Sequence, residues 1–238
     1  MFRVAYHPKH MRIRHFVKYT FLKVDPAWRR LDSSERAEHK REFAAACEDF
    51  SDGHLLRSFS LVGTRGDADM MLLSQAQNLE RIHEFHVVLQ QSGLMKWSET
   101  SYSFLAMTKE SEYSDESRLE VRPAHGKYLF VYPFVKTRDW YLLDPKERWR
   151  IMQEHIKVGK EFPSVDLNTS YSFGLDDQEF VVAFESDNPG DFLDLVQKLR
   201  TTESSAFTKR DTPTFTCVSC SLERALGSLD GELLALSA

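Results

Sequence analysis

Residues 127–162 read KYLFVYPFVKTRDWYLLDPKERWRIMQEHIKVGKEF, and this stretch predicts one strand, a short turn and one capped helix. Side chains that alternate along 127–136 share one face of the strand: Tyr128, Phe130, Tyr132, Phe134 and Lys136. The helix is expected to begin after Asp144, with Pro145 at its first position and Glu147 placed to complete a capping box. The stretch therefore forms a strand–turn–helix unit with defined faces.

The expected helix carries a histidine on its apolar face. That face has Trp149 at its start and continues at helical spacing through four positions: Met152, His155, Ile156 and Gly159. A histidine in such surroundings is more often a core residue than a ligand, and periodicity alone leaves both interpretations open. A tyrosine and a lysine project together from the preceding strand. We therefore expect these groups to surround a large, flat, anionic cofactor.

The composition is that of a soluble globular protein. The chain has 238 residues, of which 42% are hydrophobic and 28% are charged, so it is long enough for one large core or two small ones. The formal net charge of −5 gives no global positive field that would attract nucleic acid or an anionic ligand. A site for an anion must therefore be built locally, and we expect no nucleic-acid partner.

Cysteine usage and hydropathy favour the cytoplasm. The three cysteines, Cys47, Cys217 and Cys220, do not make a disulfide framework. The last two form a C-x-x-C without a second pair inside a strand-like segment, which favours a structural role over a zinc or redox site. No apolar span approaches membrane length, and the basic N-terminus lacks the apolar region of a signal peptide. We therefore expect no membrane association.

The order of elements occurs twice along the chain. The first half is predicted as strand, helix, two strands, helix and strand at 12–23, 33–50, 56–62, 68–74, 78–91 and 99–108. The second half is predicted in the same order at 127–136, 144–161, 166–173, 179–185, 189–200 and within 206–219. The charged stretch at 109–126 contains Pro and Gly without a sustained period, so it is interpreted as a linker. No role is assigned to the first or the last dozen residues.

A short sequence pattern that occurs in both halves supports the duplication. Ser58-Phe59-Ser60 precedes Gly63 and a polar turn, and Ser170-Tyr171-Ser172 precedes Gly174 and a second polar turn. The repeated order and the matching turns predict an α+β fold with two fused ferredoxin-like βαββαβ subdomains, at 12–108 and 127–222.

Short motifs occur in order through the second half. They are VYPFVK at 131–136, DWYLL at 139–143, MQEH at 152–155, FGLDD at 173–177, AFE at 183–185 and LRTTE at 199–203. By these motifs the second half resembles the haem-binding domain of the chlorite dismutase family, most closely its coproheme decarboxylase branch. The similarity is dense from 115 to 219 and weaker from 12 to 108. It implies two ferredoxin-like halves of the dimeric α+β barrel superfamily type, with b-type haem or iron coproporphyrin III held in the second half.

The resemblance also implies a role for individual residues. His155 matches the proximal iron ligand, and Glu203 matches the carboxylate that holds this histidine. Tyr132 matches the tyrosine that becomes a radical in the decarboxylases, and Lys136 matches the lysine beside it. Trp140 matches a tryptophan of the pocket.

The distal side of the expected haem site departs from the family. Chlorite dismutases carry an arginine near the position of Leu167, and a one-residue shortening makes Asn168 the alternative occupant. Neither side chain can hold an anionic oxidant as arginine does. Some decarboxylases use a distal linker histidine as a base, for which His125 is the candidate here, and Arg118 in the same linker matches a propionate-binding arginine.

The resemblance implies a haem enzyme. The expected activity is the decarboxylation of two propionates of iron coproporphyrin III to vinyl groups, driven by hydrogen peroxide through a tyrosyl radical, which yields haem b. Assembly into a homopentamer is expected. The alternatives are a chlorite dismutase or a haem peroxidase, and a haem-binding protein without turnover on the same scaffold.

Overall fold

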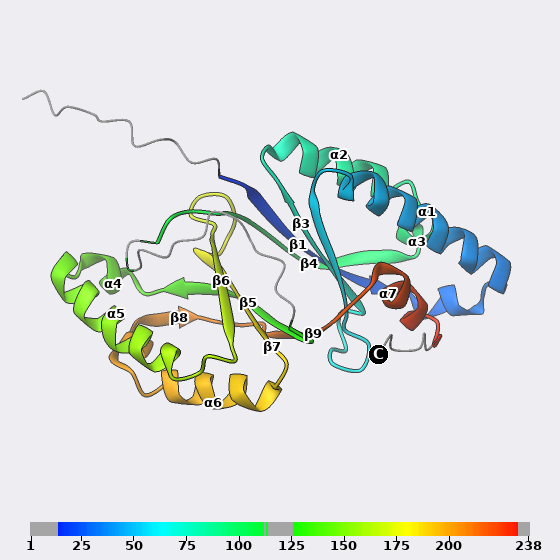
Figure 1. Ribbon diagram of the computed structural model, residues 1–238. Helices are drawn as coiled ribbons and strands as arrows, with labels where there is room; N and C mark the ends of the chain where they lie inside the picture. The colour runs from blue at the N-terminus through cyan, green and yellow to red at the C-terminus, as the bar shows by residue number, and fades with distance from the viewer. Residues whose placement is uncertain (1–13, 112, 114–125, 233–238) are drawn as a thin grey trace, which may run out of the picture.

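The structure, a computed structural model, describes residues 14–111, 113 and 126–232 (Figure 1). The first half contains β1 (Phe16–Val24), η1 (Pro26–Arg30), α1 (Ser33–Ser51), β2 (Leu55–Ser60), β3 (Met70–Ala76), α2 (Leu79–Leu89), α3 (Gly93–Lys96) and β4 (Ser98–Met107). The second half contains β5 (Tyr128–Lys136), α4 (Arg138–Leu142), α5 (Pro145–Lys160), β6 (Asp166–Tyr171), β7 (Phe180–Ser186), α6 (Pro189–Leu199), η2 (Glu203–Phe207), β8 (Thr208–Arg210), β9 (Phe215–Cys220) and α7 (Leu222–Ser228).

The strands form one antiparallel sheet that closes into a barrel. Their order is β7-β6-β4-β1-β3-β2-β9-β5-β8, and an additional pairing between β7 and β5 closes the barrel, with β8 attached to β5. The halves meet at two seams, where β4 pairs with β6 and β2 pairs with β9. Helices α1 and α2 cover the outside of one half and α5 and α6 the outside of the other (Figure 1). The predicted α+β fold with duplicated ferredoxin-like order is confirmed.

The barrel interior is filled by alternate residues of both halves. Val17, Tyr19 and Phe21 of β1 are fully buried there, because alternate residues of a strand share one face. They pack in one cluster with Leu129 and Val131 of β5. The opposite face of each sheet points outward to the helices, so each half has a second layer of its own.

The matching turns have the same backbone requirement. Gly63 has φ +83° and Gly174 has φ +72°, a region that side-chain-bearing residues rarely adopt. Each glycine follows an outgoing strand, β2 or β6, and turns the chain back into the next strand. The Ser-aromatic-Ser…Gly echo therefore reflects one turn geometry used twice.

Two local predictions need correction. The strand expected within 206–219 is divided into η2, β8 and β9, because the segment that contains Pro213 leaves the ladder and proline has no N–H to donate. Asp144 does cap α5 by accepting from the Lys146 backbone N–H at 2.9 Å. Glu147, however, accepts from Arg150 at 2.6 Å instead of completing a capping box.

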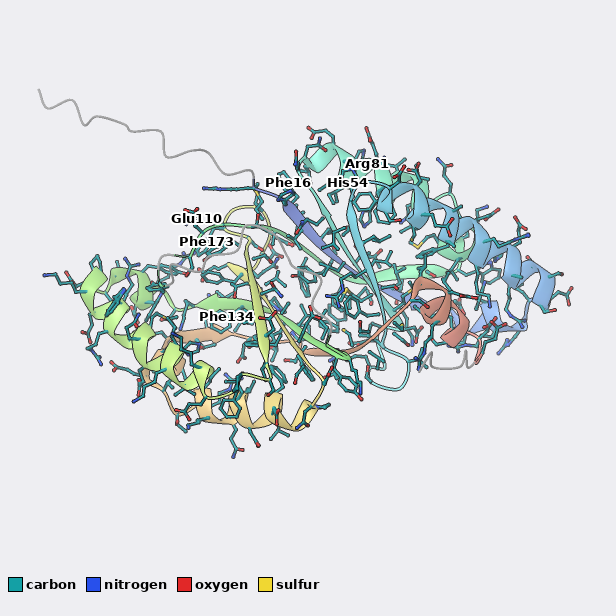
Figure 2. The ribbon with its side chains drawn as sticks, in the orientation of Figure 1. Phe16, His54, Arg81, Glu110, Phe134 and Phe173 are labelled. Atoms are coloured by element: carbon teal, nitrogen blue, oxygen red, sulfur yellow. The ribbon has the colours of Figure 1, made fainter. Side chains whose placement is uncertain are left out.

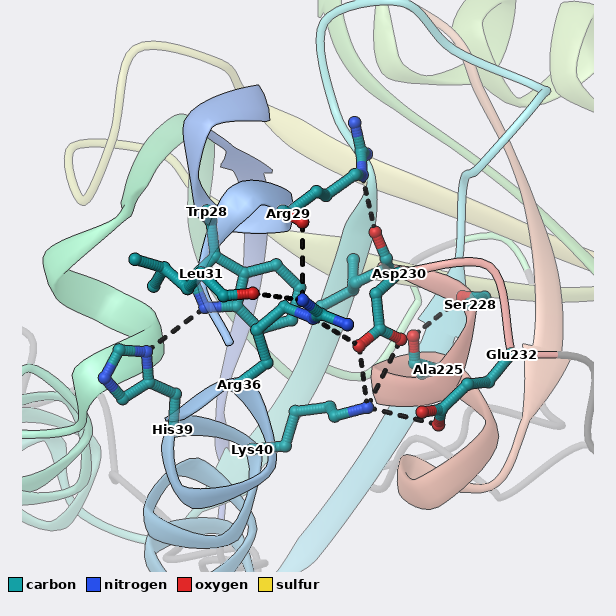
Figure 3. Close-up of polar contacts among 11 residues, drawn as sticks. Trp28, Arg29, Leu31, Arg36, His39, Lys40, Ala225, Ser228, Asp230 and Glu232 are labelled. Carbon is teal, nitrogen blue, oxygen red and sulfur yellow. Dashed lines mark hydrogen bonds and ion pairs between the residues drawn. The ribbon is translucent and has the colours of Figure 1, made fainter. Parts of the chain in front are cut away.

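The C-terminal segment is anchored, contrary to the expectation that it has no role. Asp230 is almost completely buried and binds Arg36 at 3.2 Å and Lys40 at 3.1 Å, both on α1 (Figure 3). Arg29 donates to the carbonyl of Leu229 at 2.8 Å. These contacts hold α7 and the residues after it against the first half. No helix in the described ranges is long and apolar enough to cross a membrane.

Candidate functional site

Tyr132, a residue of the predicted site, lies on the outward face of the sheet in the second half. Tyr132 lies opposite Val182 of β7, which in turn lies opposite Thr169 of β6. The Tyr132 ring stacks near Phe184 with centroids 6.2 Å apart, in the cluster that faces α6. Further along β5, Phe134, labelled in Figure 2, meets the ring of Phe180 edge-on at 6.2 Å. Aromatic side chains therefore line this face between the sheet and its helices.

Strand register distinguishes the two distal candidates. Leu167 lies opposite Phe184 and so shares the face of Tyr132, where 46% of its surface is exposed. Asn168 lies opposite Ala183, points into the barrel and is only 7% exposed. Because neighbouring residues of a strand point to opposite faces, only Leu167 is directed to the side of the candidate site.

The Tyr132 phenol stays protonated at neutral pH. Burial raises its pKa above the usual value, and the negative charge of Asp211 raises it further. Asp211 belongs to the segment after β8, which runs beside β5 because Val135 pairs with Arg210. Loss of the phenolic proton therefore needs an acceptor or the removal of an electron.

Lys136 is a buried cation with defined partners. Its Nζ donates to the carbonyl oxygen of Ser204 at 2.8 Å and to its Oγ at 2.9 Å. The same nitrogen lies 4.6 Å from the centre of the Trp140 ring. Burial lowers the pKa of Lys136 to about 8, so the side chain is still mostly charged at pH 7. The structure thus brings Lys136 and Trp140 together. Ser204, which accepts from Lys136, directly follows Glu203 in the chain.

His155 is a neutral imidazole with an unpartnered nitrogen. Its Nδ1 is buried and has no hydrogen-bond partner among the described residues. Burial, and then the positive charge of Lys136, lower the pKa of His155 to about 4. The neutral ring is the form that binds a metal. Its neighbour one turn earlier, Met152, contacts Ser204 Oγ through sulfur at 3.9 Å, which links α5 to the Lys136 site.

Glu203 has a different partner from the one expected. Its carboxylate accepts from Arg150 at 2.7 Å, and its backbone N–H donates to Glu154 at 3.2 Å. It starts η2, directly before Ser204, which holds Lys136. The role of Glu203 as the support of His155 stays a prediction.

The inner face of α5 differs from the sequence analysis at one turn. Trp149 is 53% exposed, whereas Ile151 is buried. Arg148 takes the inner position two turns before His155, and its Nε is buried without a partner among the described residues. The assignment of an apolar tryptophan to an apolar face concealed this arginine. A seven-residue spacing from His155 was the signal that could have found it.

Parts of the predicted site are not seen. Arg118 and His125 lie outside the described residues. A groove of about 360 Å³ lies at the seam of β2 and β9, between α1 and the start of α7, with Cys47 and Cys220 among its lining residues. It is remote from the cluster of Tyr132, Lys136 and His155.

Comparison with known proteins identifies a relative by sequence and similar folds among solved structures. A coproheme decarboxylase from Mycolicibacterium smegmatis is 31% identical over 175 residues, which cover 72% of this chain and 75% of that protein. The fold is similar to that of chlorite dismutase from Candidatus Nitrospira defluvii in complex with imidazole, with a TM-score of 0.84 at 23% identity over 91% of this chain and 95% of that one. A variant of the same enzyme in complex with cyanide gives a TM-score of 0.84 at 22% identity, with the same shares covered.

The family itself is identified by a sequence profile. The profile described as Chlorite dismutase matches residues 14–220, which include both halves of the barrel and every described residue of the candidate site. The chain therefore belongs to the chlorite dismutase family.

Proposed function

We propose that this protein is a coproheme decarboxylase, which uses hydrogen peroxide to convert two propionates of iron coproporphyrin III to vinyl groups and so forms haem b. The observation that carries the proposal is the neutral, unpartnered His155 imidazole on α5, which lies near enough to Lys136 for that charge to lower its pKa. The relative from Mycolicibacterium smegmatis supports the choice of reaction within the family.

The residues present fit an iron porphyrin. His155 offers an imidazole that is neutral at physiological pH, as an iron ligand requires. Tyr132 of β5, Leu167 of β6 and Phe173, which follows β6, add apolar surface. Leu167 and Phe173 are about half exposed in the structure. Lys136 supplies a positive charge for an anionic edge. A flat, partly anionic ligand is the kind of molecule that such a combination suits.

Each decarboxylation is a two-electron oxidation. A propionate side chain, one proton and one hydrogen peroxide give a vinyl group, carbon dioxide and two waters. The porphyrin iron supplies the redox chemistry with peroxide when the substrate is bound. In this proposal Tyr132 gives up an electron and its phenolic proton, and the resulting radical becomes a phenol again by removing a hydrogen atom from the propionate side chain. The side chain then loses a second electron as carbon dioxide leaves, and the oxidised porphyrin would accept both electrons.

Lys136 would stabilise the negative charge of a substrate carboxylate. Its ammonium, close to Trp140 and Ser204, stabilises a carboxylate in the ionised form from which carbon dioxide leaves. His155 would hold the iron, with Glu203 as the carboxylate that supports it. Arg118 would bind a propionate and His125 would act on the distal side. A homopentamer would be the assembled form.

Chlorite chemistry is the alternative within the family. Leu167 shares the face of Tyr132 but has no charge to hold an anionic oxidant. Release of oxygen from chlorite by the purified protein would favour this alternative over decarboxylation.

The proposal is tested with the purified protein and iron coproporphyrin III. Peroxide is added in steps and the porphyrin is analysed by mass spectrometry. Stepwise loss of two carboxyl groups is expected, whereas an unchanged or bleached porphyrin would contradict the proposal.

A Tyr132→Phe variant separates binding from turnover. It should bind the substrate with unchanged Soret absorption, because only a hydroxyl is removed, and should lose decarboxylation by about a hundredfold or more. A Tyr141→Phe variant is the matched control, because Tyr141 donates its hydroxyl to Glu179 at 2.6 Å and belongs to α4 instead of β5. Normal turnover by the Tyr132 variant would remove Tyr132 from the mechanism.

A further inference from the structure

Arg148 and His155 project from α5 in nearly the same direction. Seven residues of an α-helix complete two turns to within about 20°, and they separate the two Cα atoms by about 10 Å along the axis. Ile151 and Met152, which lie between them on this face, are buried and half-buried. The inner face of the helix therefore presents a guanidinium and an imidazole two turns apart.

Arg148 has a buried hydrogen-bond donor without an acceptor among the described residues. Its Nε is buried and no described residue accepts from it. Arg150, two positions on, is largely exposed and pairs with both Glu147 and Glu203. A buried guanidinium N–H without an acceptor costs free energy, whereas an exposed one is solvated by water. Arg150 thus has its acceptors within the protein, whereas the Nε of Arg148 has none among the described residues.

Lys136 cannot supply all the positive charge that a tetracarboxylate needs. Two of the three N–H groups of its ammonium are donated to Ser204. At most one is left for a substrate oxygen. A guanidinium, by contrast, has five donors in a planar fork that matches a carboxylate.

We propose that Arg148 binds a peripheral carboxylate of the porphyrin substrate and so determines its orientation relative to His155. The inference rests on the proposed function, because the substrate is taken to be iron coproporphyrin III. Arg148 lies two turns from His155 on the same face of α5, so its guanidinium would hold a carboxylate at the edge of a porphyrin whose iron His155 binds. This carboxylate then provides the acceptor that the buried Nε lacks.

The test compares substrate affinity among variants of α5. Dissociation constants for iron coproporphyrin III are measured by Soret absorption for the wild type, Arg148→Gln, Arg148→Lys and Lys157→Gln. Lys157 is an exposed cation on the same helix, so its variant controls for a change in net charge. Circular dichroism verifies that each variant is folded.

We expect Arg148→Gln to weaken binding by about tenfold or more, and Arg148→Lys to weaken it less, because a charge remains but the fork is lost. Binding by Arg148→Gln should also depend less on salt than binding by the wild type. Lys157→Gln should stay within about twofold of the wild type. If Arg148→Gln does not fold, the loss of affinity in Arg148→Lys decides the matter.

Two results separate the possible failures. If the wild type does not bind iron coproporphyrin III, the proposed function is wrong. If the wild type binds and the Arg148 variants bind equally well, or lose no more than Lys157→Gln, only the role of Arg148 is overturned.

Discussion

The two halves share a fold but differ in what lies between helix and sheet. In the first half, α1 buries Phe43, Ala46, Cys47 and Phe50 against the sheet. In the second half, α5 buries only Ile151 among its side chains, and its inner face carries Arg148 and His155. The inner face of α1 is apolar, whereas the inner face of α5 presents a guanidinium nitrogen and an imidazole nitrogen that are buried without partners among the described residues. The difference agrees with the proposal that a ligand binds between helix and sheet in the second half.

The largest effect is expected from removing an aromatic ring in the first half. Phe50 is fully buried, and its ring stacks on Phe85 at 4.4 Å, with Arg81 and His54 beside it (Figure 2). Phe50→Ala should lower the free energy of unfolding by about 3–5 kcal/mol because it leaves a cavity. Urea denaturation measures this loss.

Met152→Ala is the counterpart in the second half. Met152 is half-buried, so the ligand-free protein should lose only about 1 kcal/mol or less. The loss of stability caused by Met152→Ala should be larger when porphyrin is bound, since the side chain then also packs against the porphyrin. Equal losses for the two variants without ligand would contradict the contrast between the halves.

A further effect is expected from pH. The pKa of His155 falls from its usual 6.5 to about 4 in the folded protein, so between these values the unfolded chain binds a proton that the folded chain does not. Stability should therefore rise with pH from about 4 to 6.5 by up to about 3 kcal/mol from this residue. The control is His155→Gln: subtracting its pH profile isolates the contribution, and identical profiles would show that the imidazole is not buried as described.

The sequence was sufficient for the parts of the site that depend on local pattern. Alternation placed Tyr132 on the correct strand face, and the Asp144-Pro145 pair marked the start of α5. It was insufficient where tertiary contacts decide. Leu167 and Asn168 could be separated only by the register of β6 on β7.

Side-chain polarity was also misleading on α5. Trp149 is apolar but largely exposed, while Arg148 is charged but turned inward. Helical periodicity assigns apolar residues to the inner face, and it fails where a charged side chain is turned inward. Glu203 shows a similar limit, since Arg150 competes for its carboxylate in a way that the LRTTE motif does not reveal.

The central claim is that the inner face of α5 is built to ligate a porphyrin iron through His155. It is tested most directly by the absorption spectrum of iron coproporphyrin III bound to wild type and to His155→Ala, each with and without imidazole in solution. We expect the variant to lose the spectrum of the imidazole-ligated iron and added imidazole to restore it. An unchanged spectrum in His155→Ala would contradict the claim.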